Sequence, residues 1–402
     1  MPLLSSIRIN GLLSFGDNGV EVALGGLNVL IGPNGSGKSN LIEVFGLLQA
    51  IPNDILIPIR QGWGINEWLW KGSKKNDHAS IETVIGYPDG IMPLRYKISI
   101  GAKGQTMEII EENLSNEKPL HGYNEPYLFL DVKNSRGVLN KKPSKKSVEN
   151  YNYRQERRLR PEDLDPNQSV LAQRRDPDQY PEITYLGKKF SQIKIYREWN
   201  FGRFTAPRLP QKTDLPEDFL LEDASNLGLV LNDLQHRGSM KPKSIVSHLR
   251  EFYENAERIT VKIHGGTVHL YLHEKGYIEP IPATRLSDGT LRFLCLLAIL
   301  CHPSPPPLIC LEEPELGLHP DIIPTVADML VEAANRTQLI VTTHSDILID
   351  ALTTYPETVI VCEKGETGTE MRRLEAKTLQ KWLKSYSLGE LWRKGEIGGT
   401  RW

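Results

Sequence analysis

The sequence has no long apolar run and no recognisable export signal. Its longest apolar stretch, from Phe293 to Cys301, is far shorter than the roughly 20 residues that cross a membrane as a helix. The first residues show no basic region leading into an apolar stretch and a cleavage site, so no secretory signal is read there. We therefore expect a cytoplasmic protein without a membrane partner.

Cysteine is scarce as well. Cys295, Cys301, Cys310 and Cys362 lie among apolar residues and form no CxxC pair. This pattern favours small core side chains, with a zinc site or a disulfide as the alternatives. Internal repeats and sustained heptads are also missing, which excludes a long coiled coil.

No sign of charge dominates, because the formal net charge is −2. A globally basic nucleic-acid binder is thereby excluded, and any such surface must be a local patch. The segment 141–175 is a candidate, with ten Lys or Arg against five Asp or Glu and with Tyr151 and Tyr153 among them. A solvated insertion or arm is the favoured interpretation. A nucleic-acid contact through phosphates and stacked bases is the alternative.

The apolar pattern predicts both helices and strands. Strand-like runs lie within 7–31, and a helix follows in which Leu41, Val44, Phe45 and Leu48 share one face. Further runs within 78–132, separated by turn residues, predict an antiparallel sheet, and 257–276 reads as a hairpin around Gly265-Gly266. A length of 402 residues fits two or three domains, or one domain with a large insertion.

The stretch GPNGSGKS, residues 32–39, follows an apolar strand and opens that helix. In this context the pattern predicts a loop whose successive N–H groups, from Asn34 to Ser39, point at phosphate oxygens. Lys38 would bridge the β- and γ-phosphates, and the Ser39 hydroxyl would bind Mg²⁺. The predicted nucleotide-binding residues of this loop are Gly32, Asn34, Gly35, Ser36, Gly37, Lys38, Ser39 and Asn40.

Two further strands end in groups that suit a phosphate site. Leu308–Leu311 is followed by Glu312 and Glu313, and two carboxylates at the end of a buried strand are costly unless they meet a cation. We assign Glu312 to Mg²⁺ and Glu313 to polarising the attacking water. His344 follows a third strand and is predicted to sense the γ-phosphate.

The stretch LSDGT, residues 286–290, stands directly before an apolar run. Ser287 and Gly289 there predict a helix start that binds phosphate through a capping hydroxyl and backbone amides.

In their order along the chain, GPNGSGKS, LSDGT, LEEPE and TTHS resemble the motifs of ATP-binding cassette (ABC) ATPases. NVLIGPNGSGKSNL and EEPELGLHP look like the soluble SMC, RecF and OLD group, of the AAA_21 type. The resemblance implies an α/β P-loop core with an antiparallel β subdomain and an inserted lobe of helices and irregular structure. We expect core segments at 1–132 and 280–402 and the inserted lobe at 133–279.

The resemblance also implies a head-to-tail homodimer that encloses two ATP molecules, with Ser287 and Gly289 of one copy meeting the nucleotide of the other. Three positions depart from the family pattern. Glu312 stands where aspartate is usual, and Asp288 stands where glycine is usual. The glutamine that binds the metal is assigned to Gln61, although QGWG also fits a simple turn.

By this resemblance the function is ATP hydrolysis coupled to a DNA-related process, either repair or anti-phage defence. The ending SLGELWRKGEIGGTRW resembles bacterial ATPases encoded beside a small Toprim-like protein. Too little chain follows VIVCEKGE for a Toprim domain, so a nuclease or effector is expected to be a separate partner. The first alternative is an ATP-gated scaffold or sensor with negligible turnover. A transporter subunit is disfavoured, because 249 positions separate Lys38 from Ser287.

Overall fold

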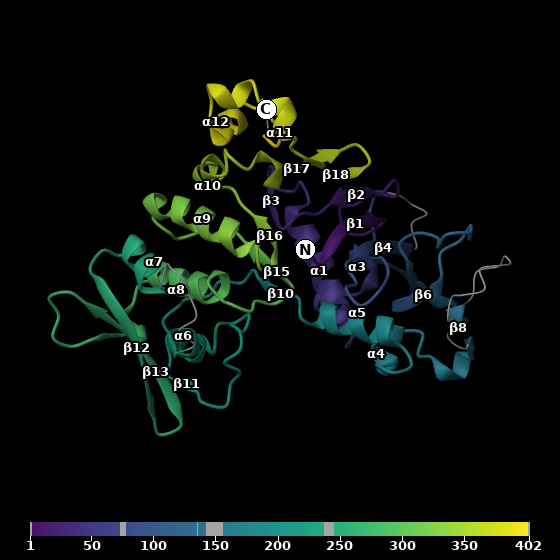
Figure 1. Ribbon diagram of the computed structural model, residues 1–402, viewed down its shortest axis with the longest axis horizontal. Coiled ribbons are helices and arrows are strands. Elements are labelled where there is room, and N and C mark those ends of the chain that lie inside the picture. The colour runs from purple at the N-terminus through teal and green to yellow at the C-terminus, as the bar shows by residue number, and fades with distance from the viewer. Residues whose placement is uncertain (1, 73–77, 135, 142–155, 237–244, 401–402) are drawn as a thin grey trace. The chain divides into compact units, whose positions relative to one another are not determined.

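The computed structural model describes residues 2–72, 78–134, 136–141, 156–236 and 245–400. It divides into two compact units (Figure 1). The first unit comprises Met1–Ile193, Val359–Leu374 and Gly398–Trp402, and the second comprises Lys194–Thr358 and Glu375–Ile397. Tyr151, Tyr153 and most lysines of the predicted basic patch lie outside the described residues.

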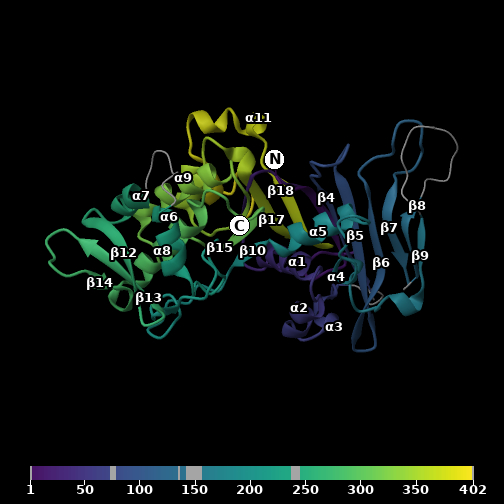
Figure 2. The same ribbon diagram turned by 60° about the horizontal axis from the view of Figure 1, so that its bottom comes forward.

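The first unit contains the antiparallel sheet that the sequence predicts, and its neighbouring strands can be followed in Figure 2. Polar and apolar side chains alternate along several strands, as in β5, because one face is buried. Cross-strand register places Ile81 opposite Ile98 and Ile98 opposite Glu112. In spatial order the strands are β2 (Val20–Ala23), β1 (Leu4–Asn10), β4 (His78–Ile85), β5 (Leu94–Lys103), β6 (Thr106–Asn116), β7 (Leu128–Lys133), β8 (Arg136–Lys141) and β9 (Arg157–Leu159).

A second group of strands in the first unit carries the glycine-rich loop. β3 (Leu27–Ile31) is buried throughout and lies parallel to β17 (Val359–Gly365), which pairs with β18 (Gly368–Arg373). Helix α1 (Lys38–Ala50) begins after the loop, and its predicted apolar face is buried. The other helices of this unit are α2 (Leu56–Gln61), α3 (Ile65–Trp68), α4 (Val170–Gln173) and α5 (Pro181–Ser191).

The second unit contains parallel strands and the helix that follows LSDGT. β10 (Lys194–Tyr196), β15 (Leu308–Glu312) and β16 (Gln338–Thr342) are parallel neighbours. Helix α8 (Asp288–Leu300) is the core helix of the unit, because every residue from Leu291 to Leu300 is buried. The remaining helices after it are α9 (Ile323–Ala333), α10 (Asp346–Ala351), α11 (Ala376–Leu379) and α12 (Leu388–Arg393).

The predicted hairpin is also present in the second unit. β12 (Ala256–His264) and β13 (Thr267–Glu274) pair around Gly265 and Gly266, and β11 (Gln211–Lys212) and β14 (Ile281–Pro282) pair with β13. Helices α6 (Leu227–His236) and α7 (Ile245–Phe252) lie near α8 in Figure 1. The rings of Phe252 and Phe293 stack at 4.4 Å, which joins α7 to α8. Short 3-10 turns occur at Pro161–Asp163, Ala283–Arg285, Pro320–Ile322, Pro356–Thr358 and Trp382–Lys384.

Several sequence predictions are confirmed by this architecture. All four cysteines are buried free thiols. In the described part of the chain the longest helices have 13 residues, so no long coiled coil is present there. None of the described helices could span a membrane. The three-segment division at residues 132 and 279 stays a prediction, and β8 and β9 of the middle segment continue the antiparallel sheet of the first unit.

Candidate functional site

The glycine-rich loop of the first unit folds around its own lysine. Lys38 is buried, and its Nζ donates to the carbonyl oxygens of Gly32 at 2.7 Å and of Pro33 at 3.1 Å. Asn34, Gly35 and Ser39 are exposed at the rim. The amine is therefore enclosed by the loop that the sequence predicts as a phosphate cradle.

The glycines of this loop are required by close neighbours as well as by backbone angles. Gly37 has φ +99°, and an added Cβ would lie 2.2 Å from Oγ1 of Thr369. A Cβ on Gly32 would lie 2.1 Å from the carbonyl oxygen of Cys362. The contact at Gly32 is with the backbone of β17 and cannot be relieved, whereas Gly37 combines a side-chain contact from β18 with a left-handed φ that favours glycine.

The loop has the features that suit a phosphate ligand. The hydroxyl of Ser36 is buried and has no hydrogen-bond partner among the described residues. The start of α1 has no side-chain cap, so its first N–H groups keep the polarity that attracts an anion. An unpartnered buried hydroxyl, a buried amine and a helix start fit the phosphates of a nucleotide.

Each predicted metal ligand is described within its own unit. Ser39 is exposed at the start of α1, Gln61 is the exposed last residue of α2, and Glu312 is the last residue of β15. No group of three or more His, Cys, Asp and Glu in the described ranges could hold a metal. Mg²⁺ at nucleotide sites uses few protein ligands together with phosphates and waters. All three assignments stay predictions.

Glu312 has neighbours that the sequence did not reveal. Its carboxylate Oε2 lies 3.2 Å from Nε of Arg197, and its carbonyl oxygen accepts a 3.0 Å hydrogen bond from the Trp199 indole. Both residues follow β10, whose pairing with β15 brings them beside the strand end. The carboxylate that was expected to meet a metal thus meets an arginine within its own unit.

Glu313 has an unusual backbone conformation. Its φ is +46°, which is rare for a residue with a side chain and costs of order 1 kcal/mol. Three contacts hold it: its N–H donates to the Thr342 carbonyl at 3.0 Å and lies 3.3 Å from the Thr342 hydroxyl, and its carbonyl accepts from Arg292 at 3.1 Å. The surrounding structure therefore holds the backbone of Glu313 in this conformation.

His344 lies beside Glu313, as the predicted roles require. Its Nε2 is 3.7 Å from Oε1 of Glu313, and both side chains are partly exposed. Glu315 positions the histidine, because its buried carboxylate accepts from the Thr343 hydroxyl at 2.6 Å and from the His344 N–H at 3.1 Å. Burial raises the pKa of the Glu315 carboxyl, and these donors act against that shift. Sequence reasoning missed Glu315, although the repeated glutamates of EEPE gave a signal.

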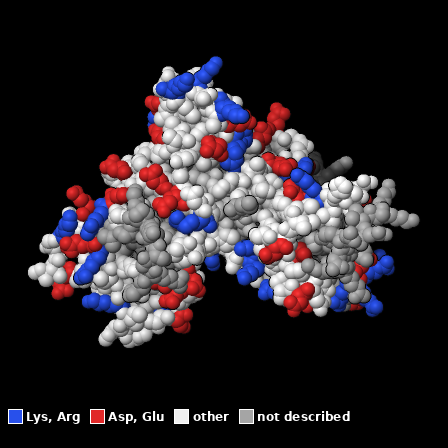
Figure 3. Space-filling view, viewed as in Figure 1, with Lys and Arg blue, Asp and Glu red and all other residues white. Residues whose placement is uncertain are grey.

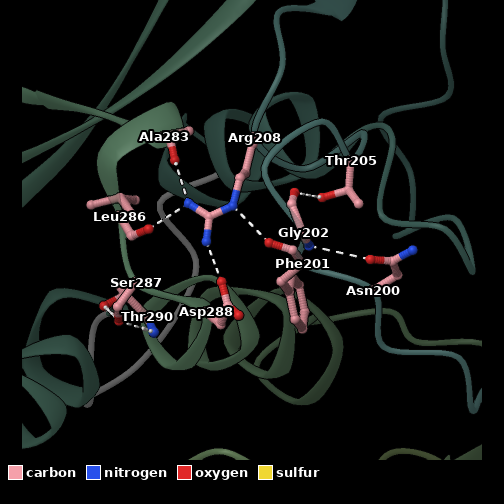
Figure 4. A network of polar contacts seen from close by, with 10 residues as sticks. All are labelled: Asn200, Phe201, Gly202, Thr205, Arg208, Ala283, Leu286, Ser287, Asp288 and Thr290. Carbon is pink, nitrogen blue, oxygen red and sulfur yellow. Dashed lines mark hydrogen bonds and ion pairs between the residues drawn. The ribbon is translucent and has the colours of Figure 1, made fainter.

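The LSDGT stretch forms the predicted helix start. The Ser287 hydroxyl accepts from the Thr290 N–H at 3.0 Å and so caps α8. A Cβ on Gly289 would lie 3.0 Å from the Gly317 carbonyl, so glycine lets the loop after Glu313 approach the helix. Ser287 and Asp288 are exposed. Asp288 pairs with Arg208, a buried residue that the sequence analysis did not single out (Figure 4).

One segment contacts both Glu312 and LSDGT. We call residues 197–208 the strap. It begins with Arg197 and Trp199 at Glu312 and ends with Arg208 at Asp288. The Trp199 ring stacks on the ring of Phe201. The guanidinium of Arg292 lies 5.1 Å from the Trp199 ring centroid and 5.7 Å from that of Phe201. The two arginines and three aromatic residues of REWNFGRF were the available signal.

Comparison with solved structures defines the class of this fold. A crystal structure of an Smc head bound to the C-winged helix domain of ScpA is similar over 94% of this chain and 100% of that chain, with a TM-score of 0.56 and 14% identity. An Smc head from Pyrococcus furiosus, bound to the C-terminal domain of ScpA, matches over 96% of this chain and 99% of that chain (TM-score 0.56, 12% identity). An Smc head from Pyrococcus yayanosii matches over 96% and 99% (TM-score 0.53, 11% identity). The fold is that of SMC-type ABC ATPase heads.

The family follows from the sequence match. Residues 27–350 match the family described as an AAA domain, putative AbiEii toxin, of type IV toxin–antitoxin systems. Because the match spans most of the chain, the protein belongs to this family. No curated protein matches the sequence. The predicted fold class and the resemblance to soluble SMC-like ATPases are confirmed, while the roles of the individual site residues stay predictions.

Proposed function

We propose that this protein binds and hydrolyses ATP as a head-to-tail homodimer. The observation that carries hydrolysis is the backbone of Glu313, which three hydrogen bonds hold in a rare conformation beside His344. An acidic residue that several hydrogen bonds hold in a rare backbone conformation next to a histidine is typical of a catalytic position. The loop around Lys38 supports the nucleotide-binding half of the proposal.

In this proposal Lys38 exchanges the loop carbonyls for the β- and γ-phosphates of ATP, and Ser36 donates to a phosphate oxygen. Glu313 accepts a proton from the attacking water, and His344 donates to the γ-phosphate. Bound Mg²⁺ would offset the negative charge on the phosphates, with Ser39, Glu312 and Gln61 as its proposed ligands. Ser287 and Gly289 meet the nucleotide held by the second copy.

We further propose that the ATP cycle serves a DNA-related defence or repair process through a separate effector. The family description, which names a putative toxin, supports the defence side. Solved Smc heads of this fold carry a bound domain of ScpA, which supports a protein partner. On the face drawn in Figure 3, basic and acidic side chains are interspersed, so the proposed DNA contact does not rest on a broad basic surface there.

One observation favours a second candidate function, an ATP-gated scaffold with negligible turnover. The Glu312 carboxylate contacts Arg197, and an arginine on a metal-binding carboxylate weakens metal binding by competing for the same oxygen.

The test is ATP turnover by the purified protein with and without double-stranded DNA, beside Lys38→Ala and Glu313→Gln. The motor proposal expects turnover that DNA increases and that both variants lose. Wild-type turnover equal to that of Glu313→Gln, with ATP-dependent dimers still formed, would replace it by the scaffold. Absence of both ATP binding and dimers would overturn both proposals.

A further inference from the structure

Arg208 makes an unusually complete set of contacts at the start of α8. Its Nε donates to the Phe201 carbonyl at 2.7 Å, its Nη1 donates to the carbonyls of Ala283 at 3.4 Å and of Leu286, and its Nη2 donates to Oδ1 of Asp288 (Figure 4). The guanidinium is buried, whereas the Asp288 side chain is 72% exposed. An arginine held by several carbonyls is fixed in place before any ligand arrives.

The strap end that carries Arg208 is itself ordered by local hydrogen bonds. The Asn200 side chain accepts from the Gly202 N–H at 3.2 Å, and the Thr205 hydroxyl donates to the Gly202 carbonyl at 2.7 Å. Phe201, which receives the Arg208 Nε, lies in the same turn and is buried. Figure 4 shows the guanidinium among its four partners, Phe201, Ala283, Leu286 and Asp288.

Asp288 poses an electrostatic problem for a phosphate-binding helix start. It stands between Ser287 and Gly289, where the positive end of the helix dipole would attract an anion. A carboxylate at this place repels phosphate, and at short range between exposed groups such repulsion changes affinity by about tenfold. Arg208 forms an ion pair with this carboxylate, and Arg292 also interacts with it electrostatically.

We propose that Arg208 is a positioning residue that neutralises Asp288 and holds Leu286–Asp288 so that the helix start accepts the phosphates of ATP. This inference rests on the proposed function, in which Ser287 and Gly289 meet the nucleotide of the second copy. Asp288 stands where the ABC ATPases that LSDGT resembles usually have glycine, and Arg208 makes that difference compatible with ATP. The ligand that this helix start is proposed to bind is therefore an anionic nucleoside triphosphate. A cationic ligand would instead need the Asp288 carboxylate to be free.

The experiment compares wild type with Arg208→Ala, Arg208→Lys, Asp288→Asn and the double variant Arg208→Ala/Asp288→Asn. The readouts are KM and kcat for ATP, the ATP-dependent dimer dissociation constant by analytical ultracentrifugation, and the melting temperature without nucleotide. Arg203→Ala is the matched control, because Arg203 lies in the same strap and is exposed.

Arg208→Ala is expected to raise KM and the dimer dissociation constant by about tenfold, more than it lowers kcat, because the uncancelled carboxylate repels the phosphates. Asp288→Asn alone, which keeps the carbonyl contacts of Arg208, should lower KM by about threefold. The double variant should return KM to within about threefold of wild type, and Arg208→Lys should lie between wild type and Arg208→Ala. The KM defect of Arg208→Ala should shrink as salt is raised.

If Arg208 has a purely structural role, a different pattern is expected. The double variant then keeps the raised KM of Arg208→Ala, and the melting temperature falls in every variant that lacks Arg208. That result overturns the inference. If Arg208→Ala is too unstable to assay, Asp288→Asn provides the test. It leaves the positive charge of Arg208 unopposed beside the phosphates, so a KM that does not fall contradicts the proposed charge balance. A wild type that neither hydrolyses ATP nor dimerises with it refutes the proposed function itself, a result distinct from either pattern.

Discussion

The two units build their candidate sites in different ways. In the first unit, the phosphate-binding groups lie in one stretch, residues 32–39, and the lysine contacts carbonyls five and six positions away. In the second unit, the candidate groups come from separate segments, and Arg208 contacts Asp288 from 80 positions away. The comparison shows that a site made of backbone groups can be encoded locally, whereas a site made of charged side chains is assembled by packing.

The largest expected effect tests the locally encoded site. Lys38→Ala should reduce ATP binding and turnover by at least about 100-fold, because the buried amine is the cation that the loop encloses. Nucleotide binding followed by calorimetry and phosphate release are the measurements. Lys103→Ala, which removes an exposed lysine of the same unit, serves as the control and should leave both unchanged. Equal ATP affinity in Lys38→Ala and wild type would contradict the assigned cradle.

The next effect separates binding from chemistry. Glu313→Gln should lower turnover by roughly 100- to 1,000-fold while ATP binding and ATP-dependent dimers persist, because the amide cannot accept a proton from water. Glu332→Gln, at an exposed helical position, is the control. Loss of binding in Glu313→Gln, or unchanged turnover, would show that Glu313 does not act as the base.

A smaller effect is expected at the strap. Trp199→Ala removes the hydrogen bond to the Glu312 carbonyl and one of the rings that flank Arg292, so turnover should fall by roughly tenfold with ATP affinity nearly kept. Trp199→Phe keeps a ring and should lose less. Trp382→Ala, at an exposed tryptophan of the same unit, controls for loss of bulk. If both Trp199 variants match wild type, the strap does not support the carboxylates.

The smallest effect concerns pH. The raised pKa of Glu315 means that the folded chain binds a proton more readily than the unfolded chain. The contribution of Glu315 to the free energy of unfolding is therefore fully present below the ordinary carboxyl pKa. It is lost as pH rises through the higher pKa of the folded state. Glu315→Gln keeps an acceptor for Thr343 and should remove that component of the slope. Melting temperatures between pH 8 and pH 5 test it, and parallel slopes for the two proteins would contradict the assignment.

Much of the fold could be predicted from the sequence. The pattern of Leu41, Val44, Phe45 and Leu48 identified α1, and Gly265-Gly266 identified the β12–β13 hairpin, because both rest on contacts between residues close in sequence. The strap could not be placed in the same way. Outside the strap its residues contact groups that are 75 to 115 positions away, and periodicity carries no information about a partner so distant.

The amino-acid sequence by itself determined the glycine-rich loop, the capped start of α8 and the acidic end of β15, since each depends on a turn, a cap or an apolar run of a few residues. Only the tertiary structure decided that Arg197 meets Glu312, that Arg292 holds the backbone of Glu313, and that Arg208 offsets Asp288. The physical reason is that the charge on a side chain is visible in a sequence, whereas the partner that neutralises it is chosen by packing of the whole unit.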